Sequence, residues 1–126
     1  MIFDTDIIIW LMKGNIPAAK IIEASVQRYM SILTRMELLQ GAIHKIHLLQ
    51  VESFISNYEF VILPLTNNIG HRALIYLEEY ALSHGLRAND AIIAATAVEN
   101  NLPLCSSNVK HYKSIKDLKF HPFHVS

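Results

Sequence analysis

Short apolar runs that alternate with helical segments are the feature of this chain that most constrains its fold. Each run is apolar along nearly its whole length, which is typical of strands buried on both faces of a sheet. Strands of this kind occur in parallel sheets whose faces are covered by helices. The runs predicted to be strands are residues 1–3, 29–33, 60–63 and 102–105, with a weaker one in the final stretch FHPFHV.

Helical segments lie between these runs. Pro17 is suited to the first turn of a helix, and Gly85 to the position that ends one. The predicted helices are residues 6–13, residues 17–27, a segment beginning at Thr34, the stretch LLQVESFISNY, residues 66–83 and residues 89–99. The alternation predicts an α/β fold, a three-layer α/β/α sandwich with a mainly parallel central sheet. A chain of 126 residues is expected to form one domain over residues 1–126.

The composition also indicates that the chain has a surface for a partner. Hydrophobic residues make up 52% of the chain and charged residues 17%, which is more apolar surface than one small domain easily buries. Basic and acidic residues number 11 each, so any basic surface for nucleic acid must be local. Cys105 is the only cysteine, which suits a reducing cytoplasm and a buried structural thiol. The N-terminal segment is expected to be neither a signal peptide nor a membrane span.

Three acids occupy informative positions. Asp4 follows the first predicted strand, Glu37 lies in the helix after the second strand, and Asp90 lies in the first turn of an apolar helix. Each position has a structural explanation. Asp4 could cap a helix, and Glu37 could form a capping box with Thr34. Asn89 could cap the last helix, with Asp90 in a first turn where the helix dipole favours negative charge.

The joint placement of the three acids favours a shared site. In a parallel α/β sheet, the chain leaves every strand at the same edge, and ligand sites occur at that edge. Converging carboxylates repel one another unless a cation lies between them. Carboxylate oxygens with open, hydrated coordination suit Mg²⁺ or Mn²⁺. The sequence therefore predicts a metal site formed by Asp4, Glu37 and Asp90.

With these residues in place, the chain resembles the PIN-domain ribonucleases, and in particular the VapC-type toxins of bacterial and archaeal toxin–antitoxin pairs. The resemblance covers the whole chain in three ordered blocks: IFDTDIIIWLMKG, SILTRMELLQGA and RANDAIIAATAVENNLPLCSSNVKHY. It implies a PIN-like fold. It also implies that Asp4, Glu37 and Asp90 are the core metal-binding acids.

The loop after the last main strand departs from the pattern of the family. Family members commonly carry a fourth acid there, whereas Asn108 occupies the best-matching position in this chain. An asparagine can ligate a metal or hold a metal-bound water, but it adds no charge, so one metal and two metals both remain open. Asn108 could also cap the short helix that follows. Ser106 takes the place of a family threonine, and Thr5 and Ser106 are expected to position water or phosphate.

The resemblance implies hydrolysis of an RNA phosphodiester with Mg²⁺ or Mn²⁺, leaving 5′-phosphate and 3′-hydroxyl ends. In such chemistry the metal activates a water and offsets charge on the transition state. Catalytic roles are assigned to Asp4, Glu37, Asp90 and Asn108. The candidate phosphate contacts, each of which could equally be a solvated surface charge, are Lys13, Arg35, Arg87 and Lys110.

The resemblance also implies a homodimer that is neutralised by a small antitoxin, and no association with a membrane. Residues 7–12 are apolar all round the predicted helix, which is more than one buried face needs. One face could enter the core while another receives an antitoxin helix in a groove, or the helix could be fully buried.

Two other functions remain open. The stretch IFDTDIII is similar to the Asp-x-Asp of haloacid-dehalogenase-type phosphatases, in which Asp4 would be the nucleophile and Asp6 an acid/base group. The chain is short for that class and lacks its later acidic pair. The second alternative is a PIN-like module that binds RNA or protein but has lost catalysis with the loop acid.

Overall fold

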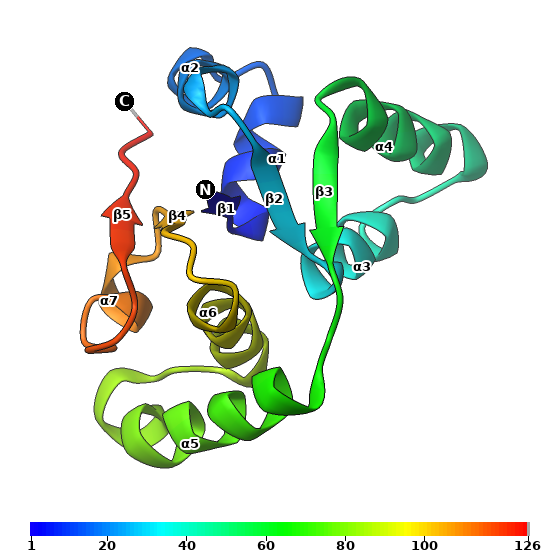
Figure 1. Cartoon of the computed structure of the whole chain (residues 1–126). Coiled ribbons are helices and arrows are strands. Elements are labelled where there is room, and N and C mark those ends of the chain that lie inside the picture. The colour runs from blue at the N-terminus through cyan, green and yellow to red at the C-terminus, as the bar shows by residue number, and fades with distance from the viewer. Residues whose placement is uncertain (126) are drawn as a thin grey trace.

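A five-stranded parallel sheet forms the centre of the computed structural model, which describes residues 1–125 (Figure 1). The strands are β1 (Ile2–Phe3), β2 (Arg28–Ser31), β3 (Phe60–Leu63), β4 (Leu104–Ser106) and β5 (Phe120–Pro122). They lie in the order β3-β2-β1-β4-β5, and every neighbouring pair is parallel. The predicted α/β fold with a mainly parallel sheet is confirmed.

Helices connect the strands and lie on both sides of the sheet. They are α1 (Thr5–Met12), α2 (Ile16–Ala24), α3 (Ile32–Gln40), α4 (Lys45–Asn57), α5 (Asn67–His84), α6 (Ala88–Glu99) and α7 (Val109–Tyr112). Gly85 ends α5 in the left-handed conformation, with φ of 67°. None of these helices combines the length and apolar character that a membrane span requires.

Alternation along the short strands divides the interior into two cores. Ile2 and Leu104 face a core shared with α5, α6 and the segment after α7. Phe3 and Cys105 face the opposite way, into a core shared with α1, α2 and α4. Successive side chains of a strand point to opposite faces, so a strand apolar at every position needs a helical layer on each side. This confirms the three-layer arrangement. In the second of these cores, burial raises the pKa of the Cys105 thiol to about 12.

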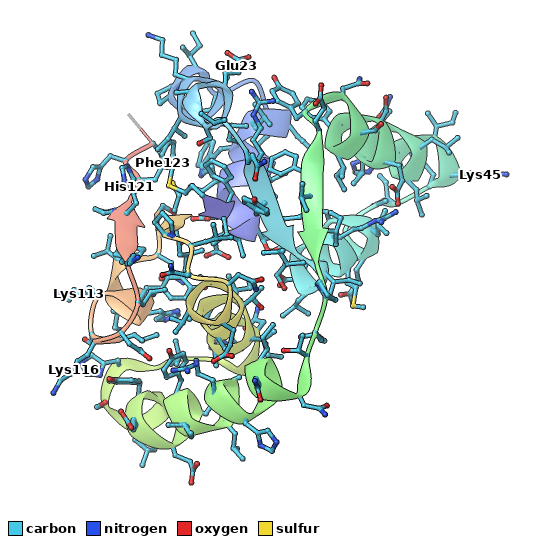
Figure 2. All side chains as sticks on the ribbon, viewed as in Figure 1. Glu23, Lys45, Lys113, Lys116, His121 and Phe123 are labelled. Carbon is cyan, nitrogen blue, oxygen red and sulfur yellow. The ribbon has the colours of Figure 1, made fainter. Side chains whose placement is uncertain are left out.

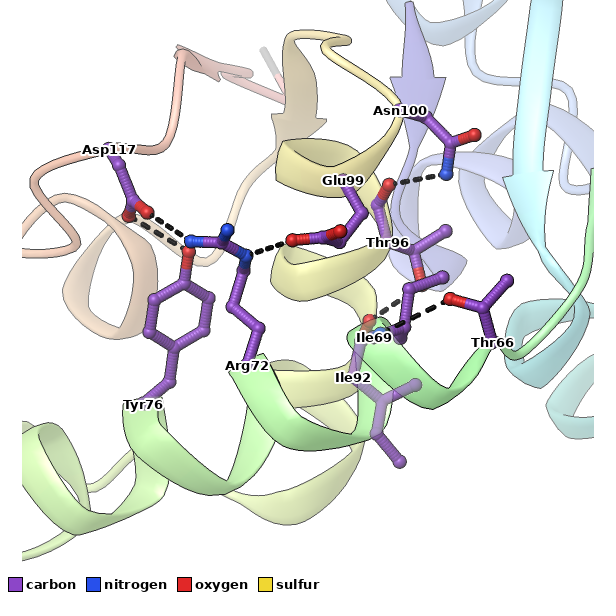
Figure 3. Close-up of polar contacts among 9 residues, drawn as sticks. All are labelled: Thr66, Ile69, Arg72, Tyr76, Ile92, Thr96, Glu99, Asn100 and Asp117. Carbon is purple, nitrogen blue, oxygen red and sulfur yellow. Dashed lines mark hydrogen bonds and ion pairs between the residues drawn. The ribbon is translucent and has the colours of Figure 1, made fainter.

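A polar cluster joins α5 to α6 at the edge of the first core (Figure 3). The Arg72 guanidinium on α5 pairs with Glu99 on α6 and with Asp117, 2.7 Å away, in the segment before β5. The Tyr76 hydroxyl donates to the second Asp117 oxygen at 2.8 Å. These contacts line an open hollow of about 530 Å³, but its central charges are already paired.

Several boundaries differ from those predicted from the sequence. β2 ends at Ser31, two residues early, because the Ser31 hydroxyl accepts from the Leu33 amide and starts α3 at Ile32. Thr34 is therefore inside α3 and buried, and it does not begin the helix. β4 begins at Leu104 because the Leu102 amide still donates to Ala97 at the end of α6.

Candidate active site

The predicted site lies where the strand order reverses direction. The chain passes from β1 to β2 and β3 on one side, then returns to β4 and β5 on the other side of β1. The crevice beyond the carboxyl ends of such strands is where open α/β sheets bind ligands. Asp4 follows β1 at this point, and its amide donates to the Cys105 carbonyl of neighbouring β4 at 2.9 Å. The backbone ladder thereby holds Asp4 beside Ser106.

Asp4 is a buried carboxylate at the base of this crevice, with 6% of its surface exposed. It is the N-cap residue of α1, as the structural explanation predicted, and its Oδ1 accepts from the Thr5 amide at 2.8 Å. The Ser106 hydroxyl donates to Oδ2 at 2.7 Å. Burial, followed by the charge of Asp6, raises the pKa of Asp4 to about 7, although both hydrogen bonds act against this shift. Asp4 thus combines the capping position with a place in the acidic crevice.

Glu37 reaches across the crevice and does not cap its own helix. Its Oε1 accepts from the Thr5 hydroxyl at 2.7 Å, and its Oε2 accepts from the Asn89 amide group at 3.1 Å. The predicted capping box with Thr34 is therefore wrong, because the N-cap of α3 is Ser31 and Thr34 lies inside the helix. The Thr34 hydroxyl lies 3.0 Å from the Thr5 hydroxyl instead. Glu37 is held by residues of α1 and α6, so three elements fix its position.

Asp90 is a buried residue in the first turn of α6, with 8% of its surface exposed. Its Oδ2 accepts from the backbone amide of Arg87, which is the N-cap residue, at 3.3 Å. Asn89 was predicted to cap this helix, and this is wrong, because the helix starts one residue earlier and Asn89 binds Glu37. His111 Nδ1 lies 2.8 Å from the same Asp90 oxygen, and the buried Tyr112 hydroxyl donates to the other at 3.4 Å.

The loop after β4 brings Asn108 to the crevice. The Asn108 amide donates to Ser106 Oγ at 3.0 Å, and the Asn108 side chain lies 2.8 Å from His111 Nδ1. Asn108 occupies the N-cap position of α7, but its side chain makes no capping hydrogen bond. The side chain is therefore directed to the acid cluster and its neighbours.

Asp6 is a fourth carboxylate at the crevice. Its Oδ2 accepts from the Ser107 amide at 3.1 Å and from the Ser107 hydroxyl. Its Oδ1 is buried and has no hydrogen-bond partner within residues 1–125. Asp6 therefore ties α1 to the loop after β4 while one of its charged oxygens remains unpaired.

These side chains line one open cleft of about 410 Å³. The carboxylates of Asp4, Asp6, Glu37 and Asp90 all face it, together with Thr5, Asn89, Ser107 and Asn108, and Ile9 and Ile93 form its apolar wall. No lysine or arginine of the part of the chain that the structure describes is among the lining residues.

A divalent cation fits the chemistry of this cleft. The donor set consists of hard carboxylate and amide oxygens, no lysine or arginine is among the described lining residues, and one buried oxygen of residues 1–125 is unpaired. Within residues 1–125, no three acidic, histidine or cysteine side chains are close enough together to enclose an ion as they stand. The side chains therefore line one cleft, and ligation requires them to move so that their oxygens converge.

The predicted phosphate contacts lie in different surroundings. Arg35 pairs with both oxygens of Glu52 on α4, at 2.9 and 3.0 Å, so it is engaged away from the acids. Lys13 lies over the Trp10 ring, and Lys110 is exposed beside the loop of Asn108. Figure 2 shows Lys113 and Lys116 at the outer edge near α7 and Lys45 at the far end of α4. Arg87 is the N-cap residue of α6 and its amide donates to Asp90, but none of the four predicted contacts is among the lining residues of the cleft.

Sequence reasoning gave no role in this site to Asn89 or Ser107, and considered Asp6 only for the phosphatase alternative. Asn89 was assigned to capping because it precedes Asp90 at a helix start. Ser107 lies in a polar loop whose direction only the fold sets. Asp6 could have been found from its spacing, since two residues after Asp4 in a first helical turn is near enough to share a cleft.

Comparison with known proteins adds to this geometry. Residues 1–116 match the PIN domain family. A search among curated proteins finds no match. A chain in a toxin–antitoxin complex from Klebsiella pneumoniae is 32% identical, with 93% of each chain covered and a TM-score of 0.77.

Other solved structures have the same fold. A chain of VapBC-1 from nontypeable Haemophilus influenzae is 28% identical, with 97% of this chain and 98% of that chain covered and a TM-score of 0.74. A chain of VapBC2 from Rickettsia felis, bound to a DNA fragment from its promoter, has a TM-score of 0.78 over 98% of this chain and 100% of that chain. Its identity is 19%, so that likeness concerns the fold alone.

Proposed function

The chain belongs to the PIN domain family, as a nuclease toxin of the VapC type, and from this premise we propose that it hydrolyses RNA phosphodiester bonds with Mg²⁺ or Mn²⁺. The observation that carries the proposal is the cleft that four carboxylates line without a lysine or arginine among its described lining residues. Such a cleft repels a phosphodiester unless a cation neutralises it.

In this proposal, Asp4, Glu37 and Asp90 hold the cation. A divalent cation, when bound, lowers the pKa of a water ligand and offsets negative charge on the phosphate. Thr5 and Asn89 fix the Glu37 carboxylate through hydrogen bonds of 2.7 and 3.1 Å, and Ser106 orients Asp4. Because these positioning groups come from different elements, the carboxylates lose little freedom when the substrate arrives.

Asn108 is proposed to orient the attacking water or a phosphate oxygen, through an amide that carries no charge. Ser106 supports it by accepting from the Asn108 amide at 3.0 Å.

The proposed domain covers residues 1–126, and the proposed location is the cytoplasm. Both proposals rest on the family and on the composition of the chain.

The proposed partner is a cognate antitoxin, as in the complex from Klebsiella pneumoniae. A groove of about 320 Å³ lies between α1, α3 and α4, with Glu37 among its lining residues, and its apolar lining includes Ile9, Met12 and Val51. Ile7, Ile8 and Leu11 on the other side of α1 are buried, whereas Ile9 is 38% exposed. An amphipathic helix of the antitoxin that entered this groove would cover the approach to the acids.

The proposal is tested with purified protein and RNA in Mg²⁺ or Mn²⁺. The parent should cleave RNA, and Asp4→Asn and Asp90→Asn should each lower the cleavage rate by about a hundredfold or more while circular dichroism is unchanged. Glu23→Gln, which removes an exposed carboxylate on α2, serves as the control and should cleave like the parent. Cleavage by both aspartate variants at the parental rate would contradict the assigned site.

The alternative of a binding module is favoured by one observation, the asparagine at position 108. RNA binding with a measurable Kd but without cleavage in either metal would support it. The phosphatase alternative has no counterpart in the family match, and capture of a phosphorylated Asp4 after incubation with a phosphate ester would be its only support.

A further inference from the structure

We propose that Asp6 supplies the fourth negative charge of the cleft, in place of the acid that the loop after β4 lacks, and that it ligates the cation through its free oxygen. This inference rests on the proposed metal site. It goes beyond that site because it assigns a ligand to a residue outside the set of Asp4, Glu37 and Asp90.

The first argument is the pairing of carboxylate oxygens in the cleft. Both oxygens of Asp4, Glu37 and Asp90 accept at least one hydrogen bond. Asp6 Oδ1 is buried and has no such partner within residues 1–125. A buried, unpaired carboxylate oxygen is costly, so a charged side chain that keeps one requires a partner that is not a protein group.

The second argument is the way in which the other oxygen is held. Asp6 Oδ2 accepts from both the amide and the hydroxyl of Ser107, the residue next to Asn108. Anchoring the loop therefore uses one oxygen only and leaves Oδ1 available. Asp6 also binds the loop in which Asn108 stands in place of an acid. Its position on α1 therefore supplies a negative charge beside that loop.

The third argument is location. Asp6 lines the same cleft as Asp4, Glu37 and Asp90, and the described lining residues include no basic side chain that could neutralise it. An ion pair with a lysine or arginine is thus excluded as the partner of Oδ1. A hard cation with several oxygen ligands accommodates an additional carboxylate and binds more tightly as ligand charge increases.

The test measures Mn²⁺ binding by electron paramagnetic resonance and calorimetry in the absence of RNA. Asp6→Asn keeps an oxygen that can accept from Ser107 but removes the charge, and it should weaken Mn²⁺ binding by about tenfold or more. Ser107→Ala removes the hydroxyl contact to Asp6 and keeps the charge, so it should weaken Mn²⁺ binding less than Asp6→Asn does. Glu23→Gln, an exposed acid of α2, controls for net charge and should bind like the parent.

A charge-relocation variant makes the test sharper. Asn108→Asp in the Asp6→Asn background returns one carboxylate to the loop, and it should recover most of the lost Mn²⁺ affinity. Parental affinity in Asp6→Asn overturns the inference and leaves Asp6 as a loop anchor. If Asp4→Asn loses Mn²⁺ binding while Asp6→Asn does not, only the role of Asp6 fails. If the parent binds no Mn²⁺, the proposed metal site fails and this inference with it.

Discussion

At the scale of one residue, burial in the cleft changes the protonation of Asp4. Its burial and the neighbouring Asp6 raise its pKa to about 7, compared with 3.8 for an exposed aspartate. The folded, metal-free protein therefore holds a proton on Asp4 at pH values where the unfolded chain has lost it. A folded state that binds more protons than the unfolded state loses stability as the pH rises.

The first prediction follows from that sign. In EDTA, the stability that depends on protonated Asp4 is fully present below pH 3.8 and is lost as the pH rises through about 7. The loss amounts to at most about 4 kcal/mol, since one pKa unit corresponds to about 1.4 kcal/mol. Asp4→Asn should remove this loss, so urea unfolding should show the variant gaining on the parent between pH 4 and pH 8, about four pH units. An equal difference at all pH values would contradict the shifted pKa.

At the scale of elements, α6 depends on small side chains. Ala91, Ala94, Ala95 and Ala97 are all fully buried, which lets this helix approach both the sheet and α5 closely. The close approach fixes the end of the helix that carries Asp90 and Asn89. Packing of α6 therefore determines the position of two residues in the cleft.

The second prediction concerns that packing. Ala94→Leu places additional methyl groups where no space is left and should destabilise the protein by about 1–3 kcal/mol in urea unfolding. The matched control is Ala88→Leu, at the exposed first position of α6, which should change stability by less than about 0.5 kcal/mol. Equal effects of the two substitutions would show that α6 is not tightly packed.

The third prediction concerns the cluster of Arg72, Glu99 and Asp117 in Figure 3. The Arg72 side chain is 35% exposed, so solvent screens its two ion pairs. Arg72→Met should therefore cost only about 1 kcal/mol, and 1 M salt, which shortens the screening length to about 3 Å, should reduce the difference from the parent. Lys113→Met, at an exposed lysine, should show no salt-dependent loss. A cost for Arg72→Met that does not change with salt would indicate lost packing of the side-chain stem.

At the scale of the whole molecule, apolar surface remains exposed on several helices. The largest exposed side chains include Ile43, Ile46 and Leu49 around α4, and Leu74 and Leu82 on α5. Patches of this kind mark sites of association. This agrees with the expectation, from composition, that the chain has a partner, and a second copy and an antitoxin are the partners proposed for it.

The fourth prediction tests both partners. Light scattering at tens of micromolar, a concentration suited to ordinary protein association, should give about twice the mass of 14.3 kDa. Met12→Lys in the groove between α1, α3 and α4 should weaken antitoxin binding by about tenfold or more and leave RNA cleavage unchanged. Val26→Lys, at a fully exposed position before β2, is the control and should bind the antitoxin like the parent. A monomer at that concentration would contradict the dimer.

The sequence by itself determined the layered α/β architecture and the convergence of Asp4, Glu37 and Asp90. Continuous apolar runs need cover on both faces, and strand ends in a parallel sheet share one edge. Both inferences depend on patterns that can be seen in the sequence, namely the continuous apolar runs and the acids that follow them. The prediction that the acids ligate a metal is supported by this convergence and awaits a binding measurement.

Only the tertiary structure decided which groups hold those acids. Glu37 binds Thr5 and Asn89, which are 32 and 52 residues away along the chain, whereas local patterns assigned Glu37 and Asn89 to helix caps. Likewise, the unpaired oxygen of Asp6 depends on the loop of Ser107, 101 residues away. Capping rules consider neighbours within a helical turn, so they cannot anticipate a hydrogen bond that forms only after three elements pack together.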